Sequence, residues 1–128
     1  MKKVGDVMKS QVMSLDSAWP VAEAQHFLND KVISGAPVVE NGRVVGVASL
    51  TTFSAYLSET GADPAKVRVS DCMTPFTFFV SPEDTLVDMM KNMVNARVHR
   101  VIVTDAERHP VGIITSLDLL EIFQKMLR

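Results

Sequence analysis

An internal repeat constrains this chain more than any other feature. The segment VGDVM at residues 4–8 resembles VSDCM at residues 69–73, which begins 65 positions later. At the same spacing, ISGAPV at residues 33–38 falls on VHRVIV at residues 98–103. A repeat of this kind indicates two copies of one supersecondary unit. Because few positions are identical, it predicts similar architecture in the two copies more strongly than similar chemistry.

The second copy predicts short strands that alternate with amphipathic helices. Residues 76–80 (FTFFV) form a short apolar run that suits a strand. The sequence SPED at residues 81–84 has the composition of a helix start, and apolar side chains then recur at helical spacing. Residues 101–103 and 111–115 predict two antiparallel strands, and Ser116 is placed to cap a last helix.

The first copy repeats this plan. It offers a strand near residues 11–15 and a helix that has Pro20 near its start. Residues 36–39 and 44–48 predict a hairpin, because Asn-Gly at its tip is a strong turn signal. A further helix follows through Phe53.

The domain organisation follows from the repeat. We expect a first repeat at residues 1–60, a linker at residues 61–68 and a second repeat at residues 69–128. One repeat alone is too small to bury both faces of a three-stranded sheet and its helices. The predicted fold is therefore α+β, with two βαββα-type repeats packed sheet to sheet about a pseudo-twofold axis. This packing would leave two related clefts between the repeats.

Composition excludes several classes of function. Charged residues make up 22% of the chain and the net charge is −2, so no basic surface for nucleic acid is expected. The sequence has no apolar run of about 18 residues for a membrane span and no secretory signal behind its first lysines. Cys72 is the only cysteine, which favours a cytoplasmic location and a buried, inert thiol.

The chain resembles a tandem pair of cystathionine β-synthase (CBS) domains, also called a Bateman module, over essentially its whole length. The most specific match is GIITSLD at residues 112–118, which fits the family pattern of glycine, two apolar residues, serine or threonine, two other residues and aspartate. VSDCMTP at residues 69–75 and VHRVIV at residues 98–103 support the resemblance in the second copy. ISGAPV at residues 33–38 and GVAS at residues 46–49 support it in the first.

The resemblance implies a function as well as a fold. Members of this family usually bind AMP, ADP, ATP, S-adenosylmethionine or related ligands between the repeats, and they report metabolite state to another protein. They usually also pair into a homodimer. By this resemblance the chain is a stand-alone, non-catalytic regulatory module that requires no cofactor, takes an adenosyl ligand and acts on an effector protein that the sequence does not name.

Thr115 and Asp118 are the leading candidates for ligand contact. A carboxylate in the first turn of a helix can accept hydrogen bonds from both hydroxyls of a ribose. The threonine hydroxyl and the free N–H groups of the helix can face a phosphate. The alternative is an acid that only stabilises the helix dipole, by about 0.3–1 kcal/mol.

His99 and Arg100 precede a buried strand, where the arginine can make a two-pronged contact with phosphate and the histidine can add a ring nitrogen. The alternative for Arg100 is a solvated residue at the edge of a strand. By matching positions in the resemblance, four residues of the first copy complete this site: Met13, Ile33, Ser34 and Gly35. Met13 and Ile33 would flank the adenine, although simple core packing explains both equally well.

A second, weaker site would involve Ser49, Thr52, Phe78 and Val98. Thr52 occupies the place of Asp118, and a threonine cannot replace a carboxylate that grips two hydroxyls. This site is therefore expected to be empty or to bind a different ligand. The alternative function for the whole chain is a dimerisation or interaction protein that kept the fold without the ligand.

An enzyme is disfavoured, because the sequence offers no pair of nucleophile and base. The three histidines have no metal-ligand spacing, so no structural metal is expected.

Overall fold

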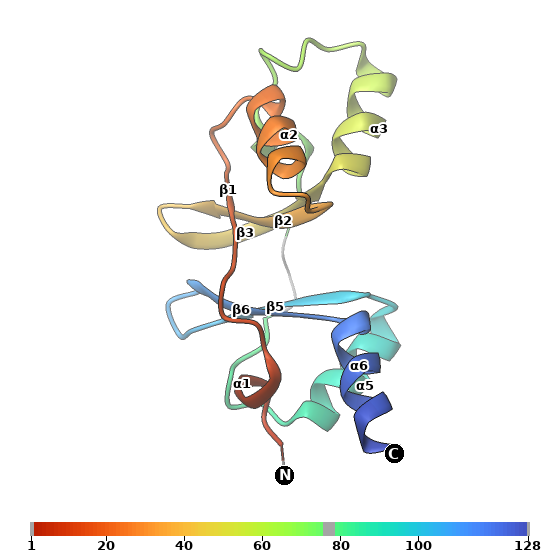
Figure 1. The fold of residues 1–128 in the computed structure, drawn as a ribbon. Helices are drawn as coiled ribbons and strands as arrows, with labels where there is room; N and C mark the ends of the chain where they lie inside the picture. The colour runs from red at the N-terminus through yellow and green to blue at the C-terminus, as the bar shows by residue number, and fades with distance from the viewer. Residues whose placement is uncertain (1, 76–78, 128) are drawn as a thin grey trace. The chain divides into compact units, whose positions relative to one another are not determined.

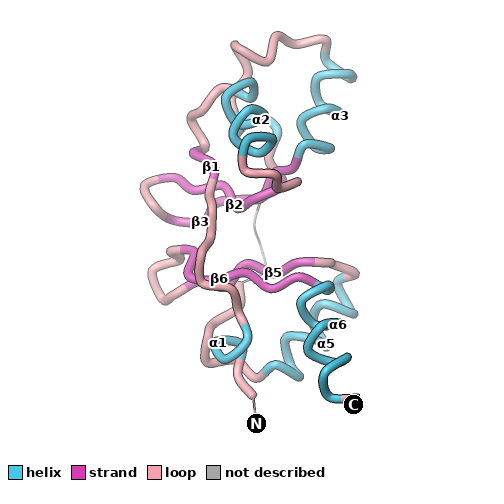
Figure 2. Tube along the Cα trace, in the orientation of Figure 1, coloured by secondary structure: helices cyan, strands magenta, loops and turns pink. Residues whose placement is uncertain are grey.

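The computed structural model describes residues 2–75 and 79–127 of the chain. Figures 1 and 2 show its helices and strands. In chain order these are α1 (Val4–Val7), β1 (Leu15–Asp16), α2 (Val21–Asp30), β2 (Gly35–Glu40), β3 (Arg43–Ser49), α3 (Leu50–Thr60), α4 (Val69–Cys72), β4 (Thr74–Pro75), α5 (Leu86–Ala96), β5 (Arg100–Thr104), β6 (Pro110–Thr115) and α6 (Ser116–Met126). This mixture of helices and short strands confirms the predicted α+β class.

The chain forms two compact units, and each unit combines residues from both sequence repeats. Unit 1 consists of Met1–Val12 and Phe78–Arg128, and unit 2 consists of Met13–Thr77. The short helix α1 from the start of the chain therefore belongs to unit 1, and α4 belongs to unit 2. Both are held by a valine with no exposed surface, Val4 in one core and Val69 in the other.

Unit 2 contains a sheet in the order β1-β2-β3-β4, in which β1 is parallel to β2 and the other neighbours are antiparallel. The predicted hairpin is confirmed as β2–β3. Asn41 and Gly42 at its tip have φ values of 55° and 81°, the positive angles that a tight hairpin turn requires. The predicted strand near residues 11–15 is shorter than expected, because only Leu15 and Asp16 pair with β2.

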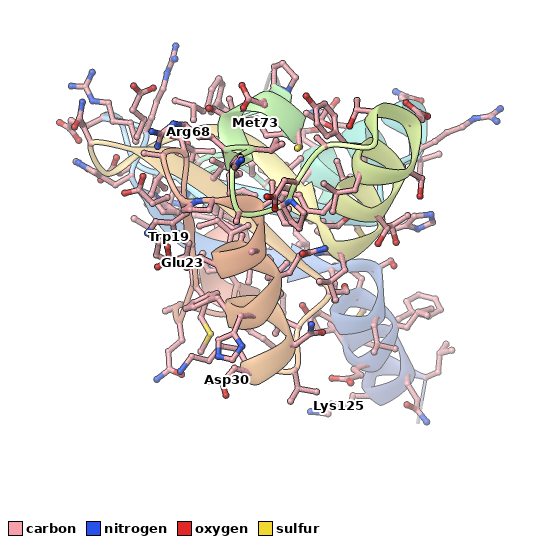
Figure 3. The ribbon with its side chains drawn as sticks, turned by 90° about the horizontal axis from the view of Figure 1, so that it is seen from above. Trp19, Glu23, Asp30, Arg68, Met73 and Lys125 are labelled. Atoms are coloured by element: carbon pink, nitrogen blue, oxygen red, sulfur yellow. The ribbon has the colours of Figure 1, made fainter. Side chains whose placement is uncertain are left out.

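Helices α2 and α3 cover one side of the unit 2 sheet (Figure 1). Val21, Ala24 and Leu28 face the core with no exposed surface, as the helical spacing of the sequence predicts. Near the start of α2, Arg68 donates a hydrogen bond from Nη1 to the carbonyl oxygen of Ala18 at 2.6 Å. This bond joins the segment before α4 to the turn before α2, in the region where Figure 3 labels Arg68.

Unit 1 contains the antiparallel hairpin β5–β6, as predicted, and helices α1, α5 and α6 lie on one side of it (Figure 1). Of the strand predicted at residues 76–80, residues 76–78 lie outside the described part of the chain, and Val80 makes an isolated parallel bridge with Val103. The core of this unit includes Leu86, Met89 and Met93 from α5.

Two predicted helix boundaries in unit 1 were wrong. Helix α5 begins at Leu86 rather than in the sequence SPED, because residues 81–84 form a separate turn. In this turn the Ser81 N–H donates to Asp84 Oδ2 at 3.0 Å, and the Glu83 N–H donates to the Ser81 hydroxyl at 3.2 Å. Thr85 then caps the helix through the backbone N–H of Asp88 at 3.2 Å. Helix α6 is capped by Thr115, one residue before the predicted Ser116. In the described part of the chain, no helix is both long enough and apolar enough to span a membrane.

Candidate functional site

Thr115 and Asp118 meet where β6 passes into α6. The Thr115 hydroxyl accepts a hydrogen bond from the backbone N–H of Asp118 at 3.1 Å, and the Thr115 N–H donates to Asp118 Oδ2 at 2.9 Å. This reciprocal pair is a capping box, which satisfies donors at the start of the helix. Asp118 is only 8% exposed. The junction therefore holds a buried carboxylate in a fixed position, and ribose binding by it stays a prediction.

Lys9 is the residue of this junction that sequence reasoning missed. Its Nζ lies 2.8 Å from Asp118 Oδ1. Its backbone is fixed against β6, because the N–H groups of Lys9 and Ile113 each donate to the other residue's carbonyl at 3.0 Å. In the internal repeat, Lys9 follows the matched segment as Thr74 does in the other copy. The unit 1 junction thus carries an ion pair between Lys9 and Asp118. In unit 2 the uncharged Thr74 occupies the position equivalent to Lys9.

The ion pair changes the proton affinity of both groups. Burial alone would raise the pKa of Asp118, but hydrogen bonds from the Lys9 ammonium and from Thr115 lower it below its usual value. The hydrogen bond to Asp118 and the negative charge of that carboxylate raise the pKa of Lys9. Both groups are therefore charged at neutral pH.

His99 and Arg100 lie beside this junction in unit 1. Arg100 is paired with Thr115 in the register of β5 and β6, and its side chain is exposed. The carbonyl oxygen of His99 accepts a hydrogen bond from the backbone N–H of Ser116 at 2.8 Å. The structure therefore brings four of the predicted residues together at one end of the β5–β6 hairpin: His99, Arg100, Thr115 and Asp118.

Two of the backbone N–H groups at the start of α6 already have partners. The N–H groups of Ser116 and Asp118 do not offer a free anion site, because they already donate to the His99 carbonyl and to the Thr115 hydroxyl. The Thr115 hydroxyl accepts this bond and keeps its own proton to donate. Recognition of a phosphate at this end of the hairpin would therefore need donors other than these two N–H groups, such as the Thr115 hydroxyl or cationic side chains.

An open pocket of about 520 Å³ lies between α5 and α6, next to His99. Among the described residues, its walls include His99 and Ser116 but neither Thr115 nor Asp118. The remaining walls are largely apolar and include Met90, Met93 and Leu119. This pocket is suited to an apolar group rather than to a sugar or a phosphate.

Unit 2 contains an equivalent junction where β3 passes into α3. Gly35 pairs with Ser49 in the register, and the Ser34 carbonyl accepts a hydrogen bond from the Leu50 N–H at 2.9 Å. The Ser49 hydroxyl accepts from the Thr52 N–H at 3.1 Å and lies 2.9 Å from the Thr52 hydroxyl. The junction therefore brings together Ser34, Gly35, Ser49 and Thr52, and its cap is uncharged.

The other predicted residues are distributed over the two units. Met13 and Ile33 belong to unit 2. Ile33 is half-buried against the core of that unit, as the core-packing alternative expects, and Met13 is 43% exposed. Val98 belongs to unit 1 and is 37% exposed, and Phe78 lies outside the described residues.

The turn between β5 and β6 gathers three further polar side chains. Asp105, Glu107 and His109 offer ligand atoms that lie within 4.8 Å of one another. Asp105 already closes the turn, because its Oδ1 accepts from the N–H groups of Glu107 and His109 and its Oδ2 lies 2.9 Å from His109 Nδ1. These bonds explain the cluster as a structural element of the hairpin.

Cys72 lies half-buried against the core of unit 2. Burial, with a smaller contribution from the nearby Asp71, raises the pKa of its thiol. A raised pKa lowers the fraction of reactive thiolate.

The two units and their capped junctions define a tandem-repeat α+β module with strand-to-helix turns at which polar residues gather. The chain belongs to the CBS domain family, since the model of the CBS domain matches residues 4–59 and again residues 69–125. This match confirms the resemblance inferred from the sequence.

Two similar proteins place the chain among longer relatives. It is 32% identical over 120 residues to the uncharacterized protein MJ1232 of Methanocaldococcus jannaschii. The matched region covers 94% of this chain and 39% of that protein. It is 25% identical over 119 residues to an inosine-5′-monophosphate dehydrogenase of Korarchaeum cryptofilum. That matched region covers 93% of this chain and 24% of the enzyme. The chain therefore spans less than half the length of these relatives.

Solved structures of CBS domain pairs share the fold. The pair of protein MJ0100, in complex with 5′-methylthioadenosine and S-adenosyl-L-methionine, matches with a TM-score of 0.84 and 22% identity over 98% of both chains. CBSX2 in complex with AMP matches with a TM-score of 0.85 and 24% identity over 100% of both chains. These likenesses confirm the fold of a CBS domain pair.

Proposed function

We propose that this chain is a regulatory module that senses an adenosyl ligand, either AMP, ADP or ATP or a ligand of the S-adenosylmethionine type. The observation that carries the proposal is the buried Asp118 carboxylate at the β6–α6 junction, with Thr115, His99 and Arg100 beside it. A fixed carboxylate can accept hydrogen bonds from ribose hydroxyls, and an arginine can bind phosphate. Similar proteins of the same fold have been solved with such ligands.

Met13, Ile33, Ser34 and Gly35 stay part of the proposal as ligand contacts, as do Ser49, Thr52 and Val98 for a weaker second site. The module acts without catalysis of its own and passes its signal to an effector protein, and a cytoplasmic location suits its single cysteine.

The proposal is tested by isothermal titration calorimetry with AMP, ADP, ATP and S-adenosylmethionine. Asp118→Asn keeps an oxygen that can cap α6 but removes the charge, and it should weaken binding of the preferred ligand about tenfold or more. Thr52→Asn changes the equivalent position of unit 2 and serves as the matched control. It should leave the affinity of the main site unchanged.

Circular dichroism and a thermal melt establish that each variant is folded. No binding of any of the four ligands at millimolar concentration to the folded wild-type chain contradicts the proposal. Equal losses in Asp118→Asn and Thr52→Asn would contradict the assignment of the ribose contact to Asp118.

A second function, self-association, is favoured by an exposed apolar face on α5 and α6. Eight large apolar side chains of these helices and their flanks are between 37% and 75% exposed: Val87, Val94, Val98, Leu117, Leu120, Phe123, Met126 and Leu127. Unit 2, by contrast, exposes only Met13 and Val32 among its described large apolar side chains. Val94 continues the apolar helical spacing of Leu86, Met89 and Met93, a pattern that predicts a buried position, but it is 75% exposed.

The size of this α5–α6 face suits a second copy of the chain. Side chains of this number and exposure offer roughly 700 Å², close to the area of about 800 Å² that one partner contributes to a standard interface. The same two helices also carry both signs of charge, with Asp88 and Lys91 on α5 and Glu121 and Lys125 on α6. A twofold interface can pair such a surface with itself. The proposed occupant is therefore the same face of a second copy.

Analytical ultracentrifugation of wild type, Leu120→Glu and Ser58→Glu tests the homodimer. Leu120→Glu places a charge in the apolar face and should convert the dimer to a monomer, while Ser58→Glu adds the same charge to exposed α3 and should not. A monomeric wild type at tens of micromolar would contradict the homodimer. A stable dimer that binds none of the adenosyl ligands would favour the interaction protein over the sensor.

A further inference from the structure

The carboxylate proposed to hold the ribose already has a partner at each oxygen. Asp118 Oδ2 accepts the Thr115 N–H at 2.9 Å, and Oδ1 faces the Lys9 ammonium at 2.8 Å. A carboxylate can accept further hydrogen bonds, but Asp118 is only 8% exposed, so a ribose diol that reaches it competes with these two partners for room. The consequence for the choice of ligand depends on which partner gives way.

Lys9 is the partner that can leave. The Thr115 N–H is part of the capping box of α6, so its displacement would disrupt the start of the helix. The Lys9 ammonium, in contrast, sits on a flexible stem, and its side chain is 68% exposed. Its departure from Asp118 breaks no backbone hydrogen bond.

A displaced Lys9 ammonium stays within reach of the Asp118 carboxylate. Its backbone is held to Ile113 by two hydrogen bonds of 3.0 Å, so only the side chain can swing. A lysine stem reaches about 6 Å from its Cα, and an ammonium that has lost its carboxylate gains most from a new anionic partner. A phosphate attached to the ribose offers that partner, whereas a neutral or cationic substituent does not.

We infer that Lys9 makes this site selective for adenosyl ligands that carry a phosphate on the ribose, by exchanging its bond with Asp118 for a bond with that phosphate. The inference rests on the proposed adenosyl site and specifies its ligand as a nucleotide. The favoured class is AMP and its relatives, rather than adenosine, 5′-methylthioadenosine or S-adenosylmethionine, which has no phosphate and a net positive charge. Thr74, the equivalent of Lys9 in unit 2, has no charge with which to make this selection.

The test compares the affinities of AMP and adenosine in four proteins: wild type, Lys9→Met, Lys9→Arg and Lys91→Met. Lys9→Met should lower the ratio of AMP affinity to adenosine affinity about tenfold. Its affinity for adenosine should stay equal or rise, because Asp118 is freed. Lys9→Arg should keep most of the ratio, and Lys91→Met, which removes an exposed charge from α5 of the same unit, should leave it unchanged.

Two outcomes overturn the inference, and they are distinguishable. If wild type binds AMP but Lys9→Met changes the affinities of AMP and adenosine by the same factor, Lys9 does not select the ligand and the adenosyl site itself stands. If wild type binds neither AMP nor adenosine nor any other adenosyl ligand at millimolar concentration, the proposed function fails and the role of Lys9 fails with it.

Discussion

The β6–α6 junction of unit 1 and the β3–α3 junction of unit 2 share one construction but differ in charge. In each, a hydroxyl side chain at the end of a strand caps the next helix: Thr115 accepts from Asp118 and Ser49 accepts from Thr52, both at 3.1 Å. In each, the first residue of the helix donates its backbone N–H to a carbonyl just before the neighbouring strand: Ser116 donates to His99 and Leu50 donates to Ser34. Among the described residues, the ion pair between Lys9 and Asp118 is found only at the unit 1 junction, since Thr52 and Thr74 carry no charge.

The comparison separates what the fold requires from what a ligand requires. A strand that turns directly into a helix needs a cap, and threonine or serine supplies it in both copies. The capping box accounts for the bond from Thr115 to Asp118, but the fold does not require a charge there or a lysine against it, because Thr52 occupies the same place in unit 2 without a charge. The charged pair of unit 1 is therefore the part of the module that calls for a functional explanation.

The largest effect is expected from alanine at the glycines that precede these junctions. A Cβ at Gly46 would lie 2.7 Å from the Thr74 carbonyl oxygen, whereas the atoms nearest to a Cβ at Gly112 belong to the side chain of Met8. A backbone carbonyl in a sheet cannot move aside as a methionine side chain can. Gly46→Ala should lower the free energy of unfolding by about 2–3 kcal/mol and Gly112→Ala by about 1 kcal/mol, as measured by urea denaturation.

The double variant Met8→Ala/Gly112→Ala provides the control for this comparison, because the smaller side chain leaves room for the new Cβ. Gly112→Ala should cost less in the Met8→Ala background than in the wild type. Equal costs for Gly46→Ala and Gly112→Ala would show that the two units tolerate the added atom alike, and the distinction between backbone and side-chain contact would fall.

The two helix caps should have similar effects when they are removed. Ser49→Ala and Thr115→Ala each delete the hydroxyl that accepts the first-turn N–H, and each should lower the free energy of unfolding by about 1 kcal/mol. Thermal or urea denaturation measures both, with Ser54→Ala on the exposed side of α3 as a control of near-zero effect. If Thr115→Ala lowered the free energy of unfolding several times more than Ser49→Ala, the ion pair would strengthen the cap of α6. The two caps would then differ in strength although their hydrogen-bond distances are the same.

Most of the local fold could be predicted because it depends on neighbours in the sequence. The hairpin followed from Asn-Gly at residues 41–42, and the buried face of α2 followed from the spacing of Val21, Ala24 and Leu28. The start of α5 could not be read reliably, since both Ser81 and Thr85 are good capping residues and only the geometry of the turn decides between them.

The ion pair shows where sequence reasoning reached its limit at the site. Asp118 was identified because its motif lies within one short segment. Lys9 reaches it only because a backbone bridge sets Lys9 against Ile113 in the folded unit. Such a contact depends on the exchange of N-terminal segments between the repeats, which the order of residues alone does not reveal.

A smaller effect is expected from a double-mutant cycle on the ion pair. Lys9→Met, Asp118→Asn and their combination should show a favourable coupling at low salt that weakens as salt screens the mostly exposed lysine. The matched cycle in unit 2, with Thr74→Met and Thr52→Asn, should show no coupling that depends on salt. Urea denaturation at two ionic strengths measures both cycles, and the same salt dependence in both would remove the electrostatic distinction between the units.

The smallest effect is a difference in the dependence of stability on pH. The pKa of Asp118 is lower in the folded chain than its ordinary value of about 3.9, so the unfolded chain binds the proton more tightly. The stabilisation is therefore fully present above about pH 4 and is lost as the pH falls through the folded value. The difference in unfolding free energy between wild type and Asp118→Asn should shrink as the pH falls from 5 to 3, while the difference between wild type and Thr52→Asn should not change, because neither side chain titrates. A constant difference for Asp118→Asn over this range would mean that its carboxylate gains nothing from Lys9 and Thr115 in the folded chain, and the charged junction would then be equivalent to the neutral one.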